Sequence, residues 1–270
     1  MKLFRRLMTL MGIIAALSIS MAATAEYSPV MEKILKTGEL RVGMSGNQPP
    51  LNAHSRNGGL IGLEVDLVKQ LASAMGVEVK FVEKPFGELL AALDKGDVDI
   101  VMSGVSITAD RTTRFAFAGP YMMSGKSLLT KSETLAAAHG PDAMNRSQYK
   151  FAALDNSTSK DFVENYLPKS KLVTVKDYDA GVKLVLDDKV DGLVADMAIC
   201  VLSVLRYPDM GLATLNHPMT VEPIGIAVPA NDPQLLNLLD NYLDALEEVG
   251  YMKELHRVWL KDDSWIAALP

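Results

Sequence analysis

Apolar residues in the first part of the chain alternate between strand-like and helix-like spacing. The runs at 40–44, 77–82 and 98–103 predict strands, and the segments 63–76 and 86–96, with apolar residues at helical spacing, predict the helices between them. Gly76 and Gly96 stand where those helices should stop. Strands separated by helices of this length imply parallel crossovers, so the pattern predicts an α/β sheet.

The same pattern then restarts after a strand-like run at 124–130. It predicts strands at 149–154, 171–175, 191–196 and 222–229, and helices at 157–167, 179–190, 197–207, 232–250 and 251–260. Two consecutive units of this kind suggest two lobes of similar size rather than one sheet. Ligands of α/β sheets bind at the carboxyl ends of strands, so we expect the binding site in the cleft between the lobes.

The first 25 residues have the pattern of an export signal. Basic residues at positions 2, 5 and 6 precede an apolar run, and the small residues "ATA" end at Ala25. The apolar run is short for a membrane span, and no second span follows. We therefore expect residues 1–25 to be a cleaved signal peptide and the protein to be soluble and periplasmic.

Charge excludes two classes of partner. The predicted signal holds three of the 27 basic residues and no acidic one, which leaves 24 basic residues against 33 acidic ones and a formal charge of about −9. No basic cluster interrupts this excess. Nucleic acid and anionic membrane surfaces are therefore poor partners.

The residues that usually carry metal or covalent chemistry are sparse. The only cysteine, Cys200, lies in the apolar stretch "MAICVLSVL" and is expected to fill core space. The four histidines are scattered without metal-ligand spacing, and no nucleotide-binding or hydrolase motif occurs. We expect no metal and no cofactor.

The stretch "SGVSITADRTTR" at 103–114 follows a predicted strand and combines small hydroxyl and glycine residues with an arginine. Small residues at a strand end let a ligand approach backbone N–H groups, and the Arg111 guanidinium can grip a carboxylate with two parallel hydrogen bonds. A structural explanation is also open, in which Thr108 or Asp110 caps a helix and Arg111 forms a surface salt bridge.

Five segments together resemble the periplasmic solute-binding proteins that serve polar amino acid ABC transporters. The resemblance covers nearly all of the chain after the predicted signal, and its segments occur in order with plausible spacing: "GLIGLEVDLVKQLASAMG", "LLAALDKGDVDIVMSGVSITADR", "FAGPYMMSGKSLL", "DGLVAD" and "EPIGIAVPAND". It implies a type 2 periplasmic-binding fold with two α/β lobes and a two-strand hinge. Lobe 1 would comprise 26–124, lobe 2 would comprise 125–220, and 221–270 would return to lobe 1.

The resemblance also implies roles for individual residues in the first lobe. Arg111 matches the arginine that clamps the α-carboxylate of the ligand, and Ser103, Gly104 and Ser106 match positions that offer backbone or hydroxyl groups to it. Phe86 matches an aromatic residue that packs on the ligand side chain, although core packing explains an apolar residue on an amphipathic helix equally well.

In the second lobe, Ser157 and Thr158 match a turn that opens a helix, whose free N–H groups face the same carboxylate. A helix N-terminus has unpaired donors and a dipole that favours an anion. Asp196 matches the carboxylate that pairs with the α-ammonium group. The local sequence alone favours helix capping for both Ser157 and Asp196.

The chain departs from the family pattern in the loop after the first strand. The stretch "NQPPL" places Gln48 where an aromatic residue is usual and Leu51 where a phenylalanine is usual. The wall over the ligand side chain is therefore altered, and we count Gln48 among the candidate ligand-binding residues. The identity of the ligand side chain is not predicted.

The resemblance implies a monomeric binding protein that captures an amino acid or a similar small zwitterion and delivers it to an inner-membrane permease. One alternative is an enzyme like the exported cyclohexadienyl dehydratases on the same scaffold. Those relatives have a glutamate after the helix-opening turn, at the position of Lys160, which disfavours a general acid here. A second alternative is a sensory role, in which the liganded protein docks on a chemoreceptor.

Overall fold

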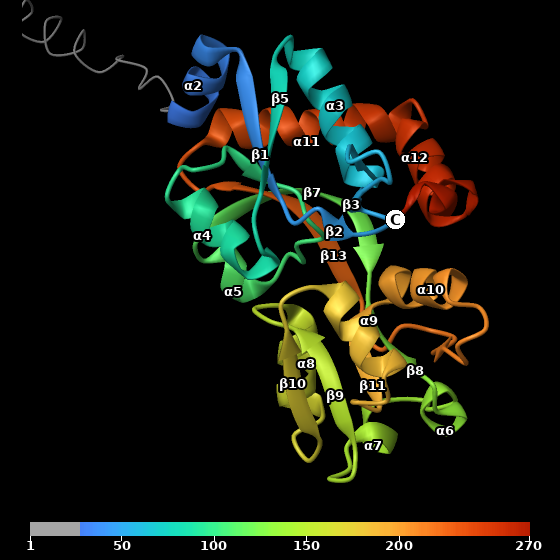
Figure 1. The fold of residues 1–270 in the computed structure, drawn as a ribbon. Coiled ribbons are helices and arrows are strands. Elements are labelled where there is room, and N and C mark those ends of the chain that lie inside the picture. Colours follow the sequence, from blue (N-terminus) through green and yellow to red (C-terminus); the bar gives the residue numbers. More distant parts are fainter. Residues whose placement is uncertain (1–27) are drawn as a thin grey trace, which may run out of the picture.

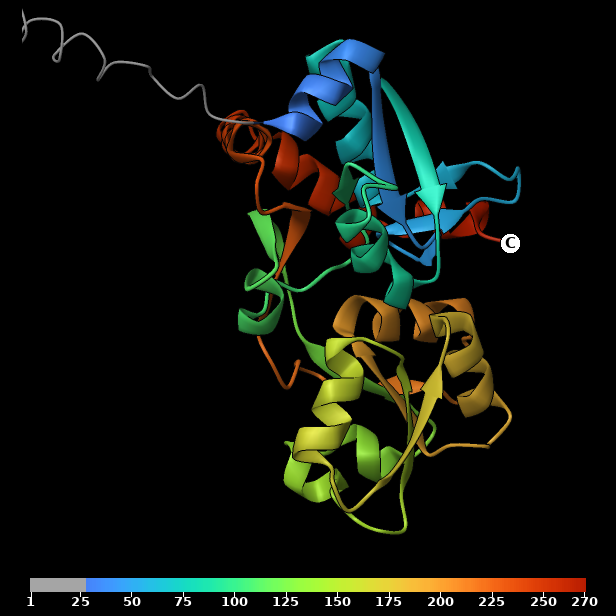
Figure 2. The same cartoon turned by 90° about the vertical axis from the view of Figure 1, so that its left-hand side faces the viewer.

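The computed structural model describes residues 28–270, so the predicted signal peptide lies outside the described residues. Two lobes stand one above the other and are joined by extended segments (Figure 1). Figure 2 shows the same division from the side. In residues 28–270, no helix has the length and apolar character needed to cross a membrane.

The first lobe is built around a five-stranded sheet with the order β5-β1-β6-β13-β7. Its strands are β1 (Glu39–Met44), β5 (Glu78–Glu83), β6 (Ile100–Val101), β7 (Phe115–Ser124) and β13 (Glu222–Pro229). β1 pairs in parallel with β5 and β6, whereas β13 runs antiparallel to β6 and β7. The lobe also holds a small antiparallel sheet made of β2 (Asn47–Gln48), β3 (Asn52–His54) and β4 (Leu60–Ile61).

Helices cover both faces of this sheet. They are α2 (Pro29–Thr37), α3 (Leu63–Met75), the 3₁₀ helix η1 (Phe86–Glu88), α4 (Leu89–Asp94), α5 (Ala109–Thr112), α11 (Pro233–Glu248), α12 (Tyr251–Leu260) and the 3₁₀ helix η2 (Ser264–Ala268). The predicted stop of α3 is confirmed, because Gly76 adopts the left-handed conformation with φ 68°.

Both ends of the described chain meet in the first lobe. Asp232 caps α11 by accepting a hydrogen bond from the Leu235 N–H at 3.1 Å. The same carboxylate accepts the Ser28 hydroxyl at 2.7 Å and the Val30 N–H at 2.6 Å. One buried aspartate therefore ties the start of α2 to the start of α11.

The second lobe is built around a sheet with the order β10-β9-β11-β8-β12. Its strands are β8 (Lys126–Thr130), β9 (Lys150–Leu154), β10 (Lys171–Val175), β11 (Gly192–Asp196) and β12 (Ala213–Thr214). Its helices are α6 (Glu133–Ala136), α7 (Pro141–Met144), α8 (Thr158–Tyr166), α9 (Tyr178–Leu186) and α10 (Met197–Arg206). β9 is parallel to β10 and β11, and β8 is antiparallel to β11.

Two chain segments cross between the lobes side by side. The outgoing segment runs from Ser124 at the end of β7 to Lys126 at the start of β8, and the returning segment enters β13 at Glu222, which pairs with Ser124. A Cβ atom at Gly125 would lie 2.0 Å from the Thr220 carbonyl oxygen. Only glycine allows the two crossings to approach this closely.

Candidate ligand-binding site between the lobes

Arg111 lies on α5, directly after the loop that leaves β6. Thr108 caps this helix, accepting a hydrogen bond from the Arg111 N–H at 3.2 Å, so the predicted local capping is confirmed. The Arg111 guanidinium donates one hydrogen bond to the Ser106 carbonyl oxygen at 2.9 Å. Among the described residues, no carboxylate lies within 4.0 Å of it, so the surface salt bridge considered above is not formed. Burial lowers the pKa of Arg111, and nearby carboxylates partly oppose that shift.

A cavity of about 270 Å³ next to Arg111 draws residues from both lobes. Phe86, Val105 and Arg111 line it from the first lobe, and Asn156 lines it from the second. The lobes are close here, because a Cβ atom at Gly87 would lie 2.6 Å from the Asn156 amide nitrogen. The structure therefore brings Phe86 and Arg111 together in one cavity. Phe86 is also 91% buried in an apolar cluster, so core packing holds it in place.

The start of α8 faces the first lobe from the other side. Ser157 is the N-cap, and its hydroxyl oxygen accepts hydrogen bonds from the Ser159 and Lys160 N–H groups at 3.2 and 3.3 Å. The hydroxyl itself donates to the Leu154 carbonyl oxygen at 2.6 Å. The capping role that the local sequence favoured for Ser157 is confirmed.

Thr158 reaches across the gap between the lobes through Glu222. Its hydroxyl donates to Glu222 Oε2 at 2.8 Å and lies 3.3 Å from the Ser106 hydroxyl, which also donates to Glu222 Oε2 at 2.7 Å. Ser106 belongs to the first lobe and Thr158 to the second, and Glu222 begins the returning strand. One carboxylate oxygen therefore links the lobes.

Lys126, on the outgoing crossing, connects Glu222 to Asp196. Its Nζ lies 2.9 Å from Asp196 Oδ1 and 3.1 Å from Glu222 Oε2, and its side chain is only 2% exposed. Asp196 also accepts the Ser124 hydroxyl at 3.1 Å and the Tyr178 hydroxyl at 3.3 Å. Asp196 makes no side-chain capping bond to α10, so the capping alternative for this residue was wrong.

In this cluster, Lys126 and Glu222 each stabilise the charged form of the other. Burial alone would lower the pKa of Lys126, but Asp196 and Glu222 together raise it above its ordinary value. Burial would raise the pKa of Glu222, but Lys126 and the hydroxyl donors Ser106 and Thr158 bring it below its ordinary value. Lys126 and Glu222 are therefore both charged at neutral pH.

Sequence reasoning did not select Lys126 or Glu222 as site residues. Lys126 could have been noticed as a lysine at the start of a predicted strand that is otherwise apolar. Glu222 stood at the edge of a predicted strand, where a charged residue is usually solvated. Only the pairing of β7 with β13 places Glu222 beside the outgoing crossing.

Ser103, Gly104 and Gln48 brace the loops that surround the site. The Ser103 hydroxyl accepts the Ser45 N–H at 3.0 Å and donates to Gln48 Oε1 at 2.5 Å. The Gly104 N–H, at φ 62°, donates to Glu64 Oε1 at 2.7 Å. The donors of Ser103 and Gly104 are thus used inside the first lobe in this conformation, and the direct ligand contacts expected for Ser103, Gly104 and Gln48 stay a prediction.

Glu64 is a buried carboxylate that the sequence reasoning did not identify. Besides Gly104, it accepts the Tyr121 hydroxyl and the Asn52 amide, the latter at 2.6 Å. Burial raises its pKa, although these three hydrogen bonds act in the opposite direction. Asn52 in turn accepts the Gly46 N–H at 2.8 Å, so Glu64 supports both loops that carry predicted site residues.

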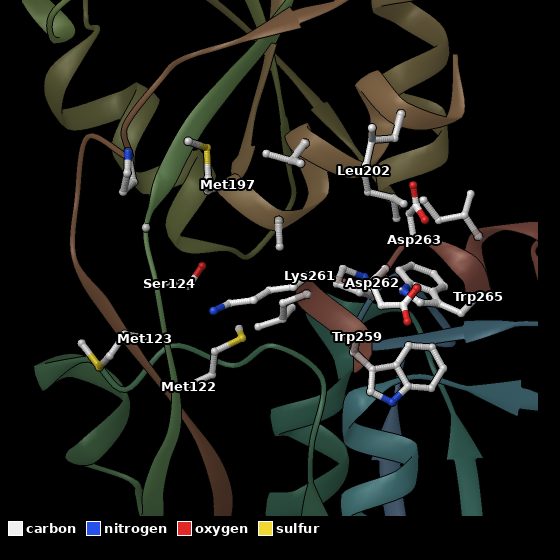
Figure 3. A pocket seen from close by; sticks show the side chains of 18 of the residues that line it. Met122, Met123, Ser124, Met197, Leu202, Trp259, Lys261, Asp262, Asp263 and Trp265 are labelled. Atoms are coloured by element: carbon white, nitrogen blue, oxygen red, sulfur yellow. Dashed lines mark hydrogen bonds between the residues drawn. The ribbon is translucent and has the colours of Figure 1, made fainter. Parts of the chain in front are cut away.

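A second cavity, of about 500 Å³, lies beside the crossing segments (Figure 3). Methionines of β7 and α10 line it together with Trp259 and Trp265, and Lys261 projects into it. None of the predicted ligand-binding residues contributes to its wall. The two tryptophans of the chain therefore lie between the lobes.

The described residues hold no group of three or more histidine, cysteine, aspartate or glutamate side chains suited to a metal ion. The site therefore consists of an arginine, a helix N-terminus and an ionic cluster between two lobes.

Residues 40–262 match the bacterial extracellular solute-binding proteins, family 3. The chain belongs to this family. The predicted family is thus confirmed.

Relatives of this family 3 protein include both binding proteins and an enzyme. The cyclohexadienyl dehydratase of Pseudomonas aeruginosa is 24% identical over 260 residues, covering 96% of each chain. The L-cystine-binding protein TcyJ of Escherichia coli is 24% identical over 260 residues, covering 94% of this chain and 95% of the relative. Most of the other similar proteins are also binding proteins by name.

Solved structures confirm the predicted fold class. The crystal structure of an ancestral amino acid-binding protein, described as a precursor of cyclohexadienyl dehydratase, has a TM-score of 0.78 and 31% identity, covering 86% of this chain and 99% of that chain. This family 3 protein therefore has the two-lobed α/β fold of type 2 periplasmic binding proteins.

Proposed function

We propose that this protein is the substrate-binding component of an ABC transporter. It captures an amino acid or a similar small solute with a carboxylate group between its lobes and delivers that solute to a membrane permease. The observation that carries the proposal is Arg111, in a cavity shared by the lobes and without an ion-pair partner among the described residues. An arginine has five N–H donors, and one of them is used by Ser106, which leaves a fork for a carboxylate.

The N-terminus of α8 supports the same proposal. It approaches the first lobe at Thr158, where the helix dipole favours an anion. Arg111 and Thr158 belong to different lobes, so a ligand that contacts both has more contacts when the lobes are together. Ligand then shifts the population towards the closed form, which the permease reads.

The names of the relatives agree with this role. TcyJ binds L-cystine by its name, and a similar solved protein from Wolinella succinogenes was crystallised with lysine. Export through the predicted signal peptide would place the protein in the periplasm, and we propose that it acts there as a monomer. A chemoreceptor in place of the permease is the alternative partner, and capture assays with each membrane protein separate the two.

We propose that the protein has no dehydratase activity, although one relative is named a dehydratase. Lys160 stands at the position where the resemblance places the catalytic glutamate. Its ammonium group lies 3.1 Å from the Asp155 carboxylate. A lysine held in this way cannot protonate a leaving hydroxyl as a carboxylic acid would. Turnover of prephenate or arogenate by the purified protein would contradict this assignment.

A thermal-shift screen against amino acids and small organic acids tests the binding role. A ligand that binds only the folded form raises the unfolding temperature with concentration. Tryptophan fluorescence provides a second readout, since both tryptophans line the cavity between the lobes. Absence of any stabilising small carboxylate in the screen would refute the proposed function.

A further inference from the structure

Asp196 and Glu222, the two carboxylates of the ionic cluster, already accept donors from the chain itself. Asp196 accepts three donors, from Lys126, Ser124 and Tyr178. Glu222 Oε2 accepts Lys126, Ser106 and Thr158. The other Glu222 oxygen accepts the Thr220 hydroxyl at 2.9 Å. A ligand ammonium group entering here would find each carboxylate oxygen already holding at least one donor.

The Lys126 ammonium group lies between the Asp196 and Glu222 carboxylates. Its side chain is 2% exposed, whereas Asp196 and Glu222 are 14% and 15% exposed, so the lysine lies deeper than the carboxylates that it joins. Moving it away would leave two partly buried carboxylates without their cation, which is strongly unfavourable. Lys126 is therefore a fixed part of the site.

The N–H donors of Arg111, by contrast, are mostly unused. Arg111 uses one N–H on Ser106, and its remaining donors point to no carboxylate within 4.0 Å among residues 28–270. Arg111 thus offers free cationic donors, whereas the two carboxylates of the cluster, Asp196 and Glu222, already accept donors from the chain. A carboxylate has a partner there, but an ammonium beside it would lose water without gaining an equivalent partner.

We infer that Lys126 takes the place of a ligand ammonium group, so that the site selects small organic acids without an α-amino group over the corresponding amino acids. This inference rests on the proposed function and narrows its substrate class. The cation that pairs with Asp196 is the Lys126 ammonium group of the protein. The ligand then supplies only the carboxylate that pairs with Arg111.

One feature of the cluster favours the opposite preference. Two carboxylates share a single lysine, and their excess negative charge attracts an ammonium ion. The hydrogen-bond saturation of Asp196 and Glu222 opposes this attraction and decides the preference, because every oxygen of the two carboxylates already accepts a donor from the chain.

The experiment compares matched acids that differ only in the α-amino group. Glutarate and L-glutamate, succinate and L-aspartate, and 3-phenylpropanoate and L-phenylalanine are titrated by calorimetry into wild-type protein. For the pair whose members bind, we expect the acid without the amino group to bind at least tenfold more tightly. A smaller or opposite ratio overturns the inference and leaves the proposed function standing. If no member of any pair binds, both fail.

Lys126→Met tests the cause of the preference. The substitution keeps the length of the side chain and frees both carboxylates, so the ratio should move at least tenfold towards the amino acid. Lys131→Met is the matched control, since Lys131 lies just after β8 and its ammonium pairs with Asp188 instead. An unchanged ratio in folded Lys126→Met protein overturns the inference. If circular dichroism shows that this variant does not fold, the wild-type ratio alone decides.

Discussion

Replacement of Arg111 by lysine provides the most direct test of the candidate site. The change keeps the positive charge but removes the planar fork that holds a carboxylate with two parallel hydrogen bonds. In the structure, Arg111 donates one hydrogen bond to the Ser106 carbonyl oxygen, and its other donors are free in the cavity between the lobes. We therefore expect the fold to persist and ligand affinity to fall.

The size of the loss follows from the hydrogen bonds involved. A hydrogen bond to a charged group contributes about 1.5–3 kcal/mol. Lysine retains one such bond to the ligand and loses the other, which corresponds to roughly a 10- to 150-fold increase in Kd. The loss should be similar for every carboxylate ligand, because it arises from the group that all of them share.

Calorimetry with the tightest ligand from the thermal-shift screen measures this loss. Arg257→Lys is the matched control, because Arg257 lies on α12, outside the cavity that Arg111 lines, and pairs with Glu254 where both side chains are more than half exposed. An exposed pair contributes about 0–1 kcal/mol to stability, and Arg257 is not expected to touch the ligand. If both variants bind as the wild type does, Arg111 does not hold the ligand, and the proposed site is wrong.

Three further substitutions test the link between the lobes, the core and the buried carboxylate. Thr158→Val removes a hydroxyl that connects the lobes through Glu222, so solution scattering should show a larger radius of gyration without ligand; an unchanged value contradicts this. Leu40→Ala, at a fully buried position of β1, should cost about 2–5 kcal/mol in denaturant unfolding, whereas Leu35→Ala, at a position 64% exposed, should cost less than about 0.5 kcal/mol; equal losses contradict the assigned core. Burial raises the pKa of Glu64, so its contribution to stability is fully present below about pH 4.5 and is lost as pH rises through the folded-state pKa; parallel pH–stability curves for wild type and Glu64→Gln contradict this.

Much of the fold was readable from local pattern, because periodicity and stop residues act within a short window. The helix ending at Gly76 and the strand at 222–229 appear where the spacing placed them. The strand predicted at 98–103 was too long, since only Ile100–Val101 is strand in the structure. An apolar run shows that a segment is buried but does not show where the chain turns, and here it turns at Gly104 with φ 62°.

The candidate site was predicted only in part, for a physical reason. Arg111, Ser157 and Asp196 stand at the ends of regular elements, where local sequence already indicates a polar role. Glu222 has its effect through partners that are distant in sequence, and only sheet pairing brings it to the crossing between the lobes. The local sequence around Glu222 does not indicate these long-range contacts.

The buried lysine shows why a matched position does not guarantee a matched role. Asp196 lies at the end of β11, as the resemblance implied, and its carboxylate is partly exposed. Its ability to hold a ligand cation depends on what else it holds, and here Lys126 lies 2.9 Å away with a raised pKa. One residue on a neighbouring strand can therefore change the charge that a site requires of its ligand, while the ligand-facing residues remain the same. We infer that the preference between an amino acid and its deaminated counterpart depends on that lysine, which comparison of residue types at the cleft surface alone would not reveal.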